Sequence, residues 1–99
     1  METGLSDSVV LVTGGAGGIG ESICRAFASE GAKVIVHYHE SSYNAEKIAN
    51  EIDGFSIKAD LRDSSQALSL IDTIVDTYGK LDICIANAGY YPPESKPIW

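Results

Sequence analysis

Basic residues are scarce in this 99-residue sequence, which has seven Lys and Arg against fourteen Asp and Glu and a formal net charge of −7. The basic residues are scattered and form no patch, which excludes a nucleic acid or an anionic membrane surface as an expected partner. A small anionic ligand would therefore have to be held by local groups. The length favours one domain with a modest hydrophobic core.

Long hydrophobic runs are also missing. No apolar stretch reaches the length needed to span a membrane, and the first seven residues contain neither the basic nor the apolar segment of a secretory leader. We therefore expect a soluble, cytoplasmic protein that does not bind membranes.

Cysteine and histidine occur only twice each. Cys24 and Cys84 fall in a predicted helix and a predicted strand, where a free thiol behaves as a small hydrophobic group. The cysteines lack the spacing of a metal-binding pair, and His37 and His39 have no third ligand near them in the sequence. We predict no metal site.

The most informative stretch of the chain is rich in glycine and runs from Val9 to Gly20. Val9 to Val12 are consecutive apolar residues typical of a strand that is buried on both faces, and the following glycines predict a tight turn into a helix beginning near Gly18. Glycine lets the backbone approach a ligand closely, and a helix N-terminus attracts anions. We interpret this unit as a phosphate-binding loop; a turn that merely connects strand and helix is the alternative.

Strands and helices alternate along the rest of the chain. Further strands are predicted at 33–38, 55–59 and 81–86, and apolar residues at helical spacing predict the intervening helices, each ended by a glycine: Gly31, Gly54 and Gly79. This alternation predicts an α/β fold with a doubly wound parallel sheet of strand order 3-2-1-4. The loop at 13–20 and the turn at 87–89 should then meet at the switch point, where ligands bind.

The apolar faces of two helices are predicted from the same spacing. In the first helix, Ile19, Ile23, Ala26 and Phe27 should pack on the sheet. In the third helix, the predicted buried face consists of Ala67, Leu68, Ile71, Ile74, Val75 and Tyr78, and Asp63 with Gln66 resembles an N-capping arrangement.

Three short motifs resemble the short-chain dehydrogenase/reductase family. The pattern T-G-x-x-x-G-I-G from Thr13 to Gly20 resembles the family's glycine motif. Asn87–Gly89 is similar to the family's N-N-A-G turn, with Ala86 in place of the first Asn, and Asp60 with Leu61 is similar to its adenine-binding pair. The resemblance runs from about residue 8 to residue 93 and implies a Rossmann-type sheet. It also implies that residues 1–99 are a single NAD(P)-binding domain, the first half of such a sheet, incomplete at its C-terminus.

By this resemblance, the cofactor is expected to contact three turns at the carboxyl ends of the strands. The alternatives for two of these residues are structural: Asn87 as an ordinary polar turn residue and Asp60 as a solvent-facing strand end. The expected cofactor-binding residues are Thr13, Gly14, Gly15, Gly17, Gly18, Ile19, Gly20, Tyr38, His39, Ser41, Ser42, Asp60, Leu61, Asn87, Ala88 and Gly89.

The end of the second strand bears on the choice between NAD and NADP. NAD-selective members of the family place an Asp there, which binds the ribose hydroxyls and repels a 2′-phosphate. This sequence has Tyr38 instead, followed by His39, Ser41 and Ser42, whose side chains can donate hydrogen bonds to a phosphate. These residues slightly favour NADP over NAD.

Two observations keep NAD open. Gly17 stands where many NADP-using members carry a basic residue, and Glu40 lies twenty positions after Gly20, near the spacing of a ribose-binding acid. For His39, a solvated loop histidine is as good an interpretation as a phosphate ligand.

The segment from Tyr43 to Lys47 matches the family's Y-x-x-x-K pattern, in which the Tyr donates a proton to the substrate. In the family this pair follows the fourth strand, whereas here it begins the second helix, beside the adenosine half of the cofactor. We interpret it as surface helix. The sequence therefore offers no catalytic residue, and we expect the 99-residue chain to be inactive alone.

The resemblance implies that the complete protein transfers a hydride between the nicotinamide and a small carbonyl or alcohol substrate. A non-catalytic dinucleotide-binding or regulatory module is the alternative. A flavodoxin-like or mononucleotide-binding protein is disfavoured, because the Lys-Ser/Thr ending of a P-loop is absent. The apolar strand at 81–86 would form a sheet edge, so we expect truncation, loss of order near the C-terminus or pairing, with a homo-oligomer in the complete protein.

Overall fold

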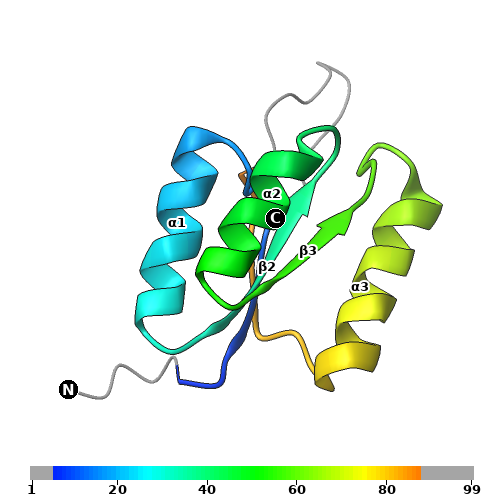
Figure 1. Ribbon diagram of the computed structural model, residues 1–99. Helices are drawn as coiled ribbons and strands as arrows, with labels where there is room; N and C mark the ends of the chain where they lie inside the picture. Colours follow the sequence, from blue (N-terminus) through cyan, green and yellow to red (C-terminus); the bar gives the residue numbers. More distant parts are fainter. Residues whose placement is uncertain (1–5, 88–99) are drawn as a thin grey trace.

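The computed structural model describes residues 6–87, which form a four-stranded parallel sheet flanked by helices (Figure 1). The strand order is β3-β2-β1-β4, as predicted from the sequence. The elements are β1 (Val9–Val12), α1 (Gly18–Ser29), β2 (Lys33–Tyr38), α2 (Ser42–Glu51), β3 (Phe55–Lys58), α3 (Ser64–Tyr78) and β4 (Ile83–Ile85).

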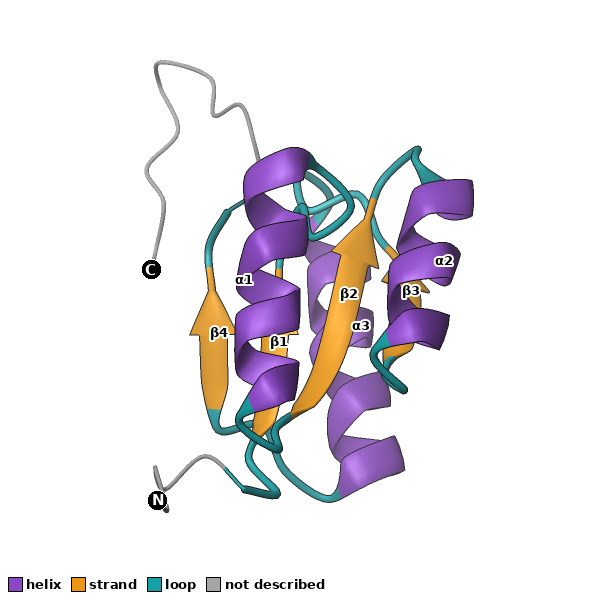
Figure 2. Ribbon diagram, turned by 60° about the vertical axis from the view of Figure 1, so that its left-hand side comes forward, coloured by secondary structure: helices purple, strands orange, loops and turns teal. Residues whose placement is uncertain are grey.

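The two faces of the sheet are covered unequally. Figure 2 shows α1 in front of the sheet and α3 behind it, while α2 lies beside α1 on the same face. We call the first side the two-helix face; its buried residues are Val10, Val12, Cys24, Val34, Val36, Ala45, Ile48 and Ala49. We call the second side the one-helix face; its buried residues are Val9, Leu11, Ile35, Ala59, Leu70 and Ile74.

The ends of α3 and α1 follow local signals in the sequence. The Asp63 carboxylate accepts a hydrogen bond from the Ser65 backbone N–H at 2.9 Å and caps the start of α3, and Gly79 ends it with a φ of 84°. After α1, Gly31 adopts a φ of 89°, one residue beyond the capping Glu30. These boundaries confirm the predictions made from the capping residue and the two glycines.

The end of α2 differs from the prediction. Asp53, and not Gly54, adopts the left-handed conformation there, with a φ of 56°. Gly54 is needed for another reason, because a Cβ at this position would lie 2.5 Å from the Val34 carbonyl oxygen. This glycine therefore permits β2 and the start of β3 to approach each other closely, which is a requirement of packing rather than of the helix end.

The predicted helix faces are partly wrong. Ile19, in the first turn of α1, is 74% exposed. The side chain that α1 buries fully is that of Cys24, further along the helix. In α3, Leu68 is 67% exposed, while Leu70, which was not predicted to be buried, contributes to the one-helix face. Helical spacing identifies apolar positions, but the direction in which a helix meets the sheet decides which of them are buried.

Strands β3 and β4 are shorter than predicted, by one and three residues respectively. At the start of β4 a cause is visible: the Asp82 N–H still donates to the Val9 carbonyl oxygen at 3.0 Å, but the Val9 N–H donates to the Asp82 carboxylate at 2.8 Å instead of to a backbone carbonyl. None of the helices between residues 6 and 87 is long and apolar enough to cross a membrane.

Candidate functional site

The loop that follows β1 is anchored on His37 of β2 by two of its backbone N–H groups. Gly14 adopts a φ of 64°, a conformation that favours glycine, and its N–H donates to Nδ1 of His37 at 3.0 Å. The next N–H, that of Gly15, donates to the His37 carbonyl oxygen, also at 3.0 Å. The loop therefore has a defined conformation against the carboxyl end of β2.

The same loop is joined to the turn that follows β4. The Thr13 hydroxyl donates to the Ile85 carbonyl at 3.2 Å and accepts from the Asn87 N–H at 2.8 Å. The Asn87 side-chain amide donates to the Gly14 carbonyl at 3.3 Å. Two turns more than seventy residues apart in the chain thus meet at one edge of the sheet, which confirms the convergence predicted from the strand order.

The glycines of this loop meet different requirements. A Cβ at Gly20 would lie 2.3 Å from the Gly14 carbonyl oxygen and 2.8 Å from the Asn87 amide nitrogen, so no side chain fits there. A Cβ at Gly15 would lie 3.0 Å from Val36 and 3.1 Å from the Cys24 sulfur. At Gly18, by contrast, a Cβ would meet nothing within 4 Å. The N-terminus of α1 therefore faces open space, with room for an anion at its positive end.

The acidic residue nearest this helix terminus is engaged by a basic partner. Arg25 donates to the Glu21 carboxylate at 2.9 Å, one turn along α1, and also pairs with Glu51 of α2. These ion pairs raise the pKa of the Arg25 guanidinium, chiefly through the bond to Glu51. Because Glu21 is partnered by a cation, its repulsion of an anion at the glycine loop is reduced.

A second cluster of polar groups lies where β2 and β3 end. The Arg62 guanidinium donates to both Asp60 oxygens at 3.0 Å, and the Arg62 N–H donates to the same carboxylate. These bonds lower the pKa of Asp60 to about 2, so the carboxylate is an acceptor at neutral pH. The His39 ring lies 3.7 Å from Asp60 and is half exposed. This cluster combines a hydrogen-bond acceptor, the Asp60 carboxylate, with two side chains able to attract a phosphate, those of His39 and Arg62.

The other predicted residues are placed around these two clusters. His39, Ser41 and Ser42 are exposed, whereas Tyr38 is half-buried against the two-helix face and Leu61 is half-buried against the one-helix face. Gly17, the residue before α1, and Ile19, its second residue, are exposed at the loop. Ala88 and Gly89 lie outside the described residues.

Two residues of the site, His37 and Arg62, were not among those predicted. For His37 a signal was present, since a polar side chain inside a buried apolar strand must find hydrogen-bond partners. Arg62 follows Asp60 by two residues, but the sequence alone does not reveal that its side chain folds back onto that carboxylate.

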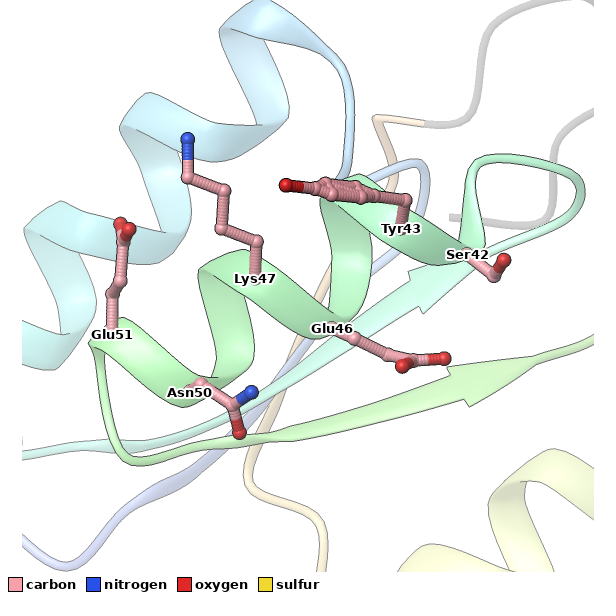
Figure 3. Close-up of a pocket in the computed structure, with 6 residues that line it drawn as sticks. All are labelled: Ser42, Tyr43, Glu46, Lys47, Asn50 and Glu51. Carbon is pink, nitrogen blue, oxygen red and sulfur yellow. The ribbon is translucent and has the colours of Figure 1, made fainter.

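Tyr43 and Lys47 lie on α2, where both are exposed (Figure 3). They line an open hollow of about 600 Å³, together with Ser42, Glu46, Asn50 and Glu51. All six residues belong to α2, and no residue of the glycine loop or of the turn at Asn87 contributes to this hollow. The Y-x-x-x-K pattern is therefore on a surface helix, as predicted from its place in the sequence.

A parallel sheet of this strand order, with a glycine loop and a second turn joined at the switch point, defines a Rossmann-type fold. The family model for short chain dehydrogenases matches residues 8–98. The chain belongs to the short-chain dehydrogenase/reductase family.

Two relatives that the chain resembles are reductases by name. The chain is 43% identical over 90 residues to versicolorin reductase of Emericella nidulans, covering 86% of this chain and 34% of that protein. It is 41% identical over 90 residues to trihydroxynaphthalene reductase of Pestalotiopsis fici, covering 86% of this chain and 32% of the relative. The chain thus spans about a third of the length of these relatives.

Solved structures agree with the fold. A short chain dehydrogenase from Burkholderia cenocepacia in complex with NADP superposes with a TM-score of 0.83 at 32% identity, covering 89% of this chain and 38% of that one. A putative dehydrogenase from the same species with bound NADP has a TM-score of 0.77 at 34% identity, covering 83% and 34% of the two chains. Both neighbours hold the same type of dinucleotide.

Proposed function

We propose that residues 1–99 form one dinucleotide-binding domain of an NAD(P)-dependent oxidoreductase. The complete protein transfers a hydride between the nicotinamide ring and a carbonyl or alcohol substrate, as the reductases among its relatives suggest. This chain supplies the binding and orientation of the cofactor, and the proton donor belongs to another part of the protein. We expect this protein to be cytoplasmic and homo-oligomeric.

The observation that carries this proposal is the junction between Thr13, Gly14 and Asn87. The hydroxyl and carbonyl groups of the loop bind the backbone and side chain of the distant turn, so the protein's own hydrogen bonds hold the two turns together at the switch point. The switch point, outside the carboxyl ends of the strands, is where doubly wound sheets bind dinucleotides. Family membership and the two NADP-bound neighbours support the same interpretation.

The pyrophosphate of the cofactor fits the space at Gly18. The missing Cβ at this residue leaves an open position, and the first N–H groups of α1 point toward it. The contact set proposed for this part of the cofactor is Thr13, Gly14, Gly15, Gly17, Gly18, Ile19 and Gly20, with Asn87, Ala88 and Gly89 from the opposite turn.

The adenosine half fits the cluster at the ends of β2 and β3. The Asp60 carboxylate is ionised and able to accept from the adenine amino group, and Leu61 follows it. Tyr38, His39, Ser41 and Ser42 surround the position of the 2′ group. We propose NADP rather than NAD, because no Asp ends β2 and because His39 lies within 3.7 Å of Asp60 in a cluster that also contains Arg62.

Calorimetric titration of the protein with NADPH and with NADH tests the proposal. We expect both to bind, with NADPH binding more tightly. Equal affinities, or tighter binding of NADH, would contradict the preference for NADP, and binding of neither would contradict the function itself.

Two substitutions at one position locate the ligand. Gly18→Asp places a carboxylate in the proposed phosphate position and should abolish binding of both dinucleotides. Gly18→Ala is the matched control, since its Cβ meets no neighbour within 4 Å and the fold should be unaffected. If Gly18→Asp binds as well as Gly18→Ala, the pyrophosphate does not lie at the N-terminus of α1.

A further inference from the structure

The His37 side chain connects two segments of the proposed cofactor site. It is 3% exposed and lies on β2, on the same side of the strand as Ile35. Its Nδ1 is 3.0 Å from the Gly14 backbone nitrogen in the glycine loop. Its Nε2 is 2.8 Å from the Ala59 carbonyl oxygen, directly before Asp60. One buried ring therefore spans from the loop after β1 to the turn after β3.

These contacts define the protonation state of the ring. The Gly14 N–H can only donate, so Nδ1 must be unprotonated, and the Ala59 carbonyl can only accept, so Nε2 must carry the proton. Both ring nitrogens are thus satisfied only when the imidazole is neutral. Protonation of Nδ1 would place two N–H groups against each other and remove the bond to Gly14.

We propose that His37 is a positioning residue for dinucleotide binding, whose neutral ring fixes the spacing between the glycine loop and the Asp60 turn. The inference rests on the proposed function, since these two segments are the ones assigned to the pyrophosphate and the adenosine. A ligand that contacts both segments pays less to order them when the protein already holds them at the right distance.

The surroundings of the ring favour the neutral form. Burial lowers the pKa of His37, the bond to Ala59 opposes this shift, and the nearby His39 lowers the pKa further. Asp60 follows Ala59 but is paired with Arg62. The loop at 13–19 carries no titratable side chain, and α3 packs on this face through Leu70 and Ile74, with its Asp72 and Asp76 exposed.

This arrangement makes cofactor affinity depend on pH. Because burial holds the folded-state pKa of His37 below the usual histidine value of 6.5, the neutral ring predominates at pH 7.5 and its bond to the Gly14 N–H is intact there. Affinity falls at lower pH, as the ring takes up a proton and the tie to Gly14 is lost.

Three substitutions separate the contributions of the two hydrogen bonds that the His37 ring makes to Gly14 and Ala59. His37→Leu removes both hydrogen bonds. His37→Asn keeps an acceptor near the position of Nδ1 for the Gly14 N–H, and His37→Gln keeps a donor near the position of Nε2 for Ala59. The control is Ile35→Val, which removes one methyl group from the same strand and face and leaves both hydrogen bonds of the His37 ring in place.

The experiment measures NADP⁺ dissociation constants of these proteins at pH 7.5 and pH 5.5, well below their unfolding temperatures. At pH 7.5 we expect His37→Leu to weaken NADP⁺ binding about tenfold, because it loses both hydrogen bonds. The Asn and Gln variants lose one hydrogen bond each and should weaken binding about threefold. Ile35→Val should bind like the wild type. As the pH falls from 7.5 toward 5.5, the wild type should lose part of its advantage over His37→Asn; the 2′-phosphate of the ligand is common to both proteins and cancels in the ratio of their dissociation constants.

Several outcomes would overturn the inference. If His37→Leu is less stable but binds NADP⁺ like Ile35→Val, the ring supports the core only. If His37→Leu does not fold, the Asn and Gln variants test the inference instead. The positioning role is rejected if both variants bind NADP⁺ with the affinity of the wild type and with the same dependence on pH. Failure of the wild type to bind NADP⁺ or NAD⁺ would instead reject the proposed function, and the role of His37 with it.

Discussion

The two faces of the sheet differ in how completely they are covered. On the two-helix face, α1 and α2 pack side by side and bury eight residues, whereas α3 alone on the one-helix face buries six and leaves Leu68, Ile71 and Val75 exposed. The difference is clearest at β4, where Cys84 is exposed on the one-helix side opposite Leu11 of β1. The proposed cofactor loop is supported from both sides, because Cys24 contacts Gly15 from the two-helix face and the His37 ring binds Gly14 from the one-helix face.

This comparison teaches that the glycine loop depends on the buried residues of each face and not on the exposed side chains of α3. The glycine loop is held by β2, α1 and the turn at Asn87, and none of these contacts depends on the exposed side chains of α3. Loop geometry should therefore survive changes on the one-helix face that leave the core intact.

The largest expected contrast is between the two cysteines. Cys24 is fully buried and burial raises its pKa to about 11, while Cys84 is exposed. A thiol reagent at neutral pH should label Cys84 about a thousandfold or more faster than Cys24, which reacts only when the structure opens. Mass spectrometry of the native protein measures both rates; comparable rates would show that α1 does not protect its side of the sheet.

Ile74 should be the most sensitive position of α3. Its side chain is fully buried between the helix and the sheet, so Ile74→Ala should lower the free energy of unfolding by about 3 kcal/mol. Leu68→Ala on the same helix is the control and should change it by no more than about 0.5 kcal/mol. Denaturant unfolding measures both values, and a costly Leu68→Ala would mean that a partner surface covers α3 in solution.

Two glycines of the α1 N-terminus should respond differently to the same substitution. Gly20→Ala should cost about 2 to 3 kcal/mol of stability, because its Cβ would overlap the Gly14 carbonyl and the Asn87 amide. Gly18→Ala should change stability by less than about 1 kcal/mol. Thermal unfolding measures the loss of stability in each variant. Equal losses for Gly20→Ala and Gly18→Ala would mean that the loop and the turn at Asn87 are not in contact.

The smallest expected effect concerns the attachment of β4. Asp82 accepts a hydrogen bond from the Val9 N–H, which together with Lys80 lowers the pKa of its carboxyl. A lowered folded-state pKa stabilises the protein above the unfolded-state value, near 3.8, and this contribution is lost as the pH falls through the folded-state pKa.

Asp82→Asn should therefore reduce stability slightly at pH 7 and hardly at all near pH 2. The matched control is Asp72→Asn on the exposed surface of α3, which should show no such difference. Unfolding curves at the two pH values measure the effect, and an equal loss for both variants at pH 7 would reject a special role for Asp82.

The sequence was sufficient to predict the strand order and the meeting of the two turns. Alternating strands and helices permit few parallel arrangements, and the glycine loop at the end of β1 marks the switch point. These features depend on patterns that repeat along the chain and on residues with special backbone properties, such as Gly31 and Gly79.

The sequence was not sufficient for contacts that depend on the direction of a side chain. Helical spacing included Ile19 and Leu68 among the packed residues, although both are exposed, because spacing does not specify how a helix is rotated on the sheet. The two nitrogens of His37 and the fork of Arg62 on Asp60 likewise involve partners that are distant in sequence or reached only by a particular rotamer.

The Thr13 hydroxyl illustrates how one atom can impose a chemical requirement on a whole site. Since it must accept from the Asn87 N–H, its own hydrogen is directed to the Ile85 carbonyl, and its orientation is not left to solvent. Valine has the same shape but would leave the Asn87 N–H without its acceptor, while the Ile85 carbonyl would keep only its bond from the backbone N–H of residue 13; serine would preserve both hydroxyl bonds. Position 13 therefore selects for an oxygen atom rather than for bulk.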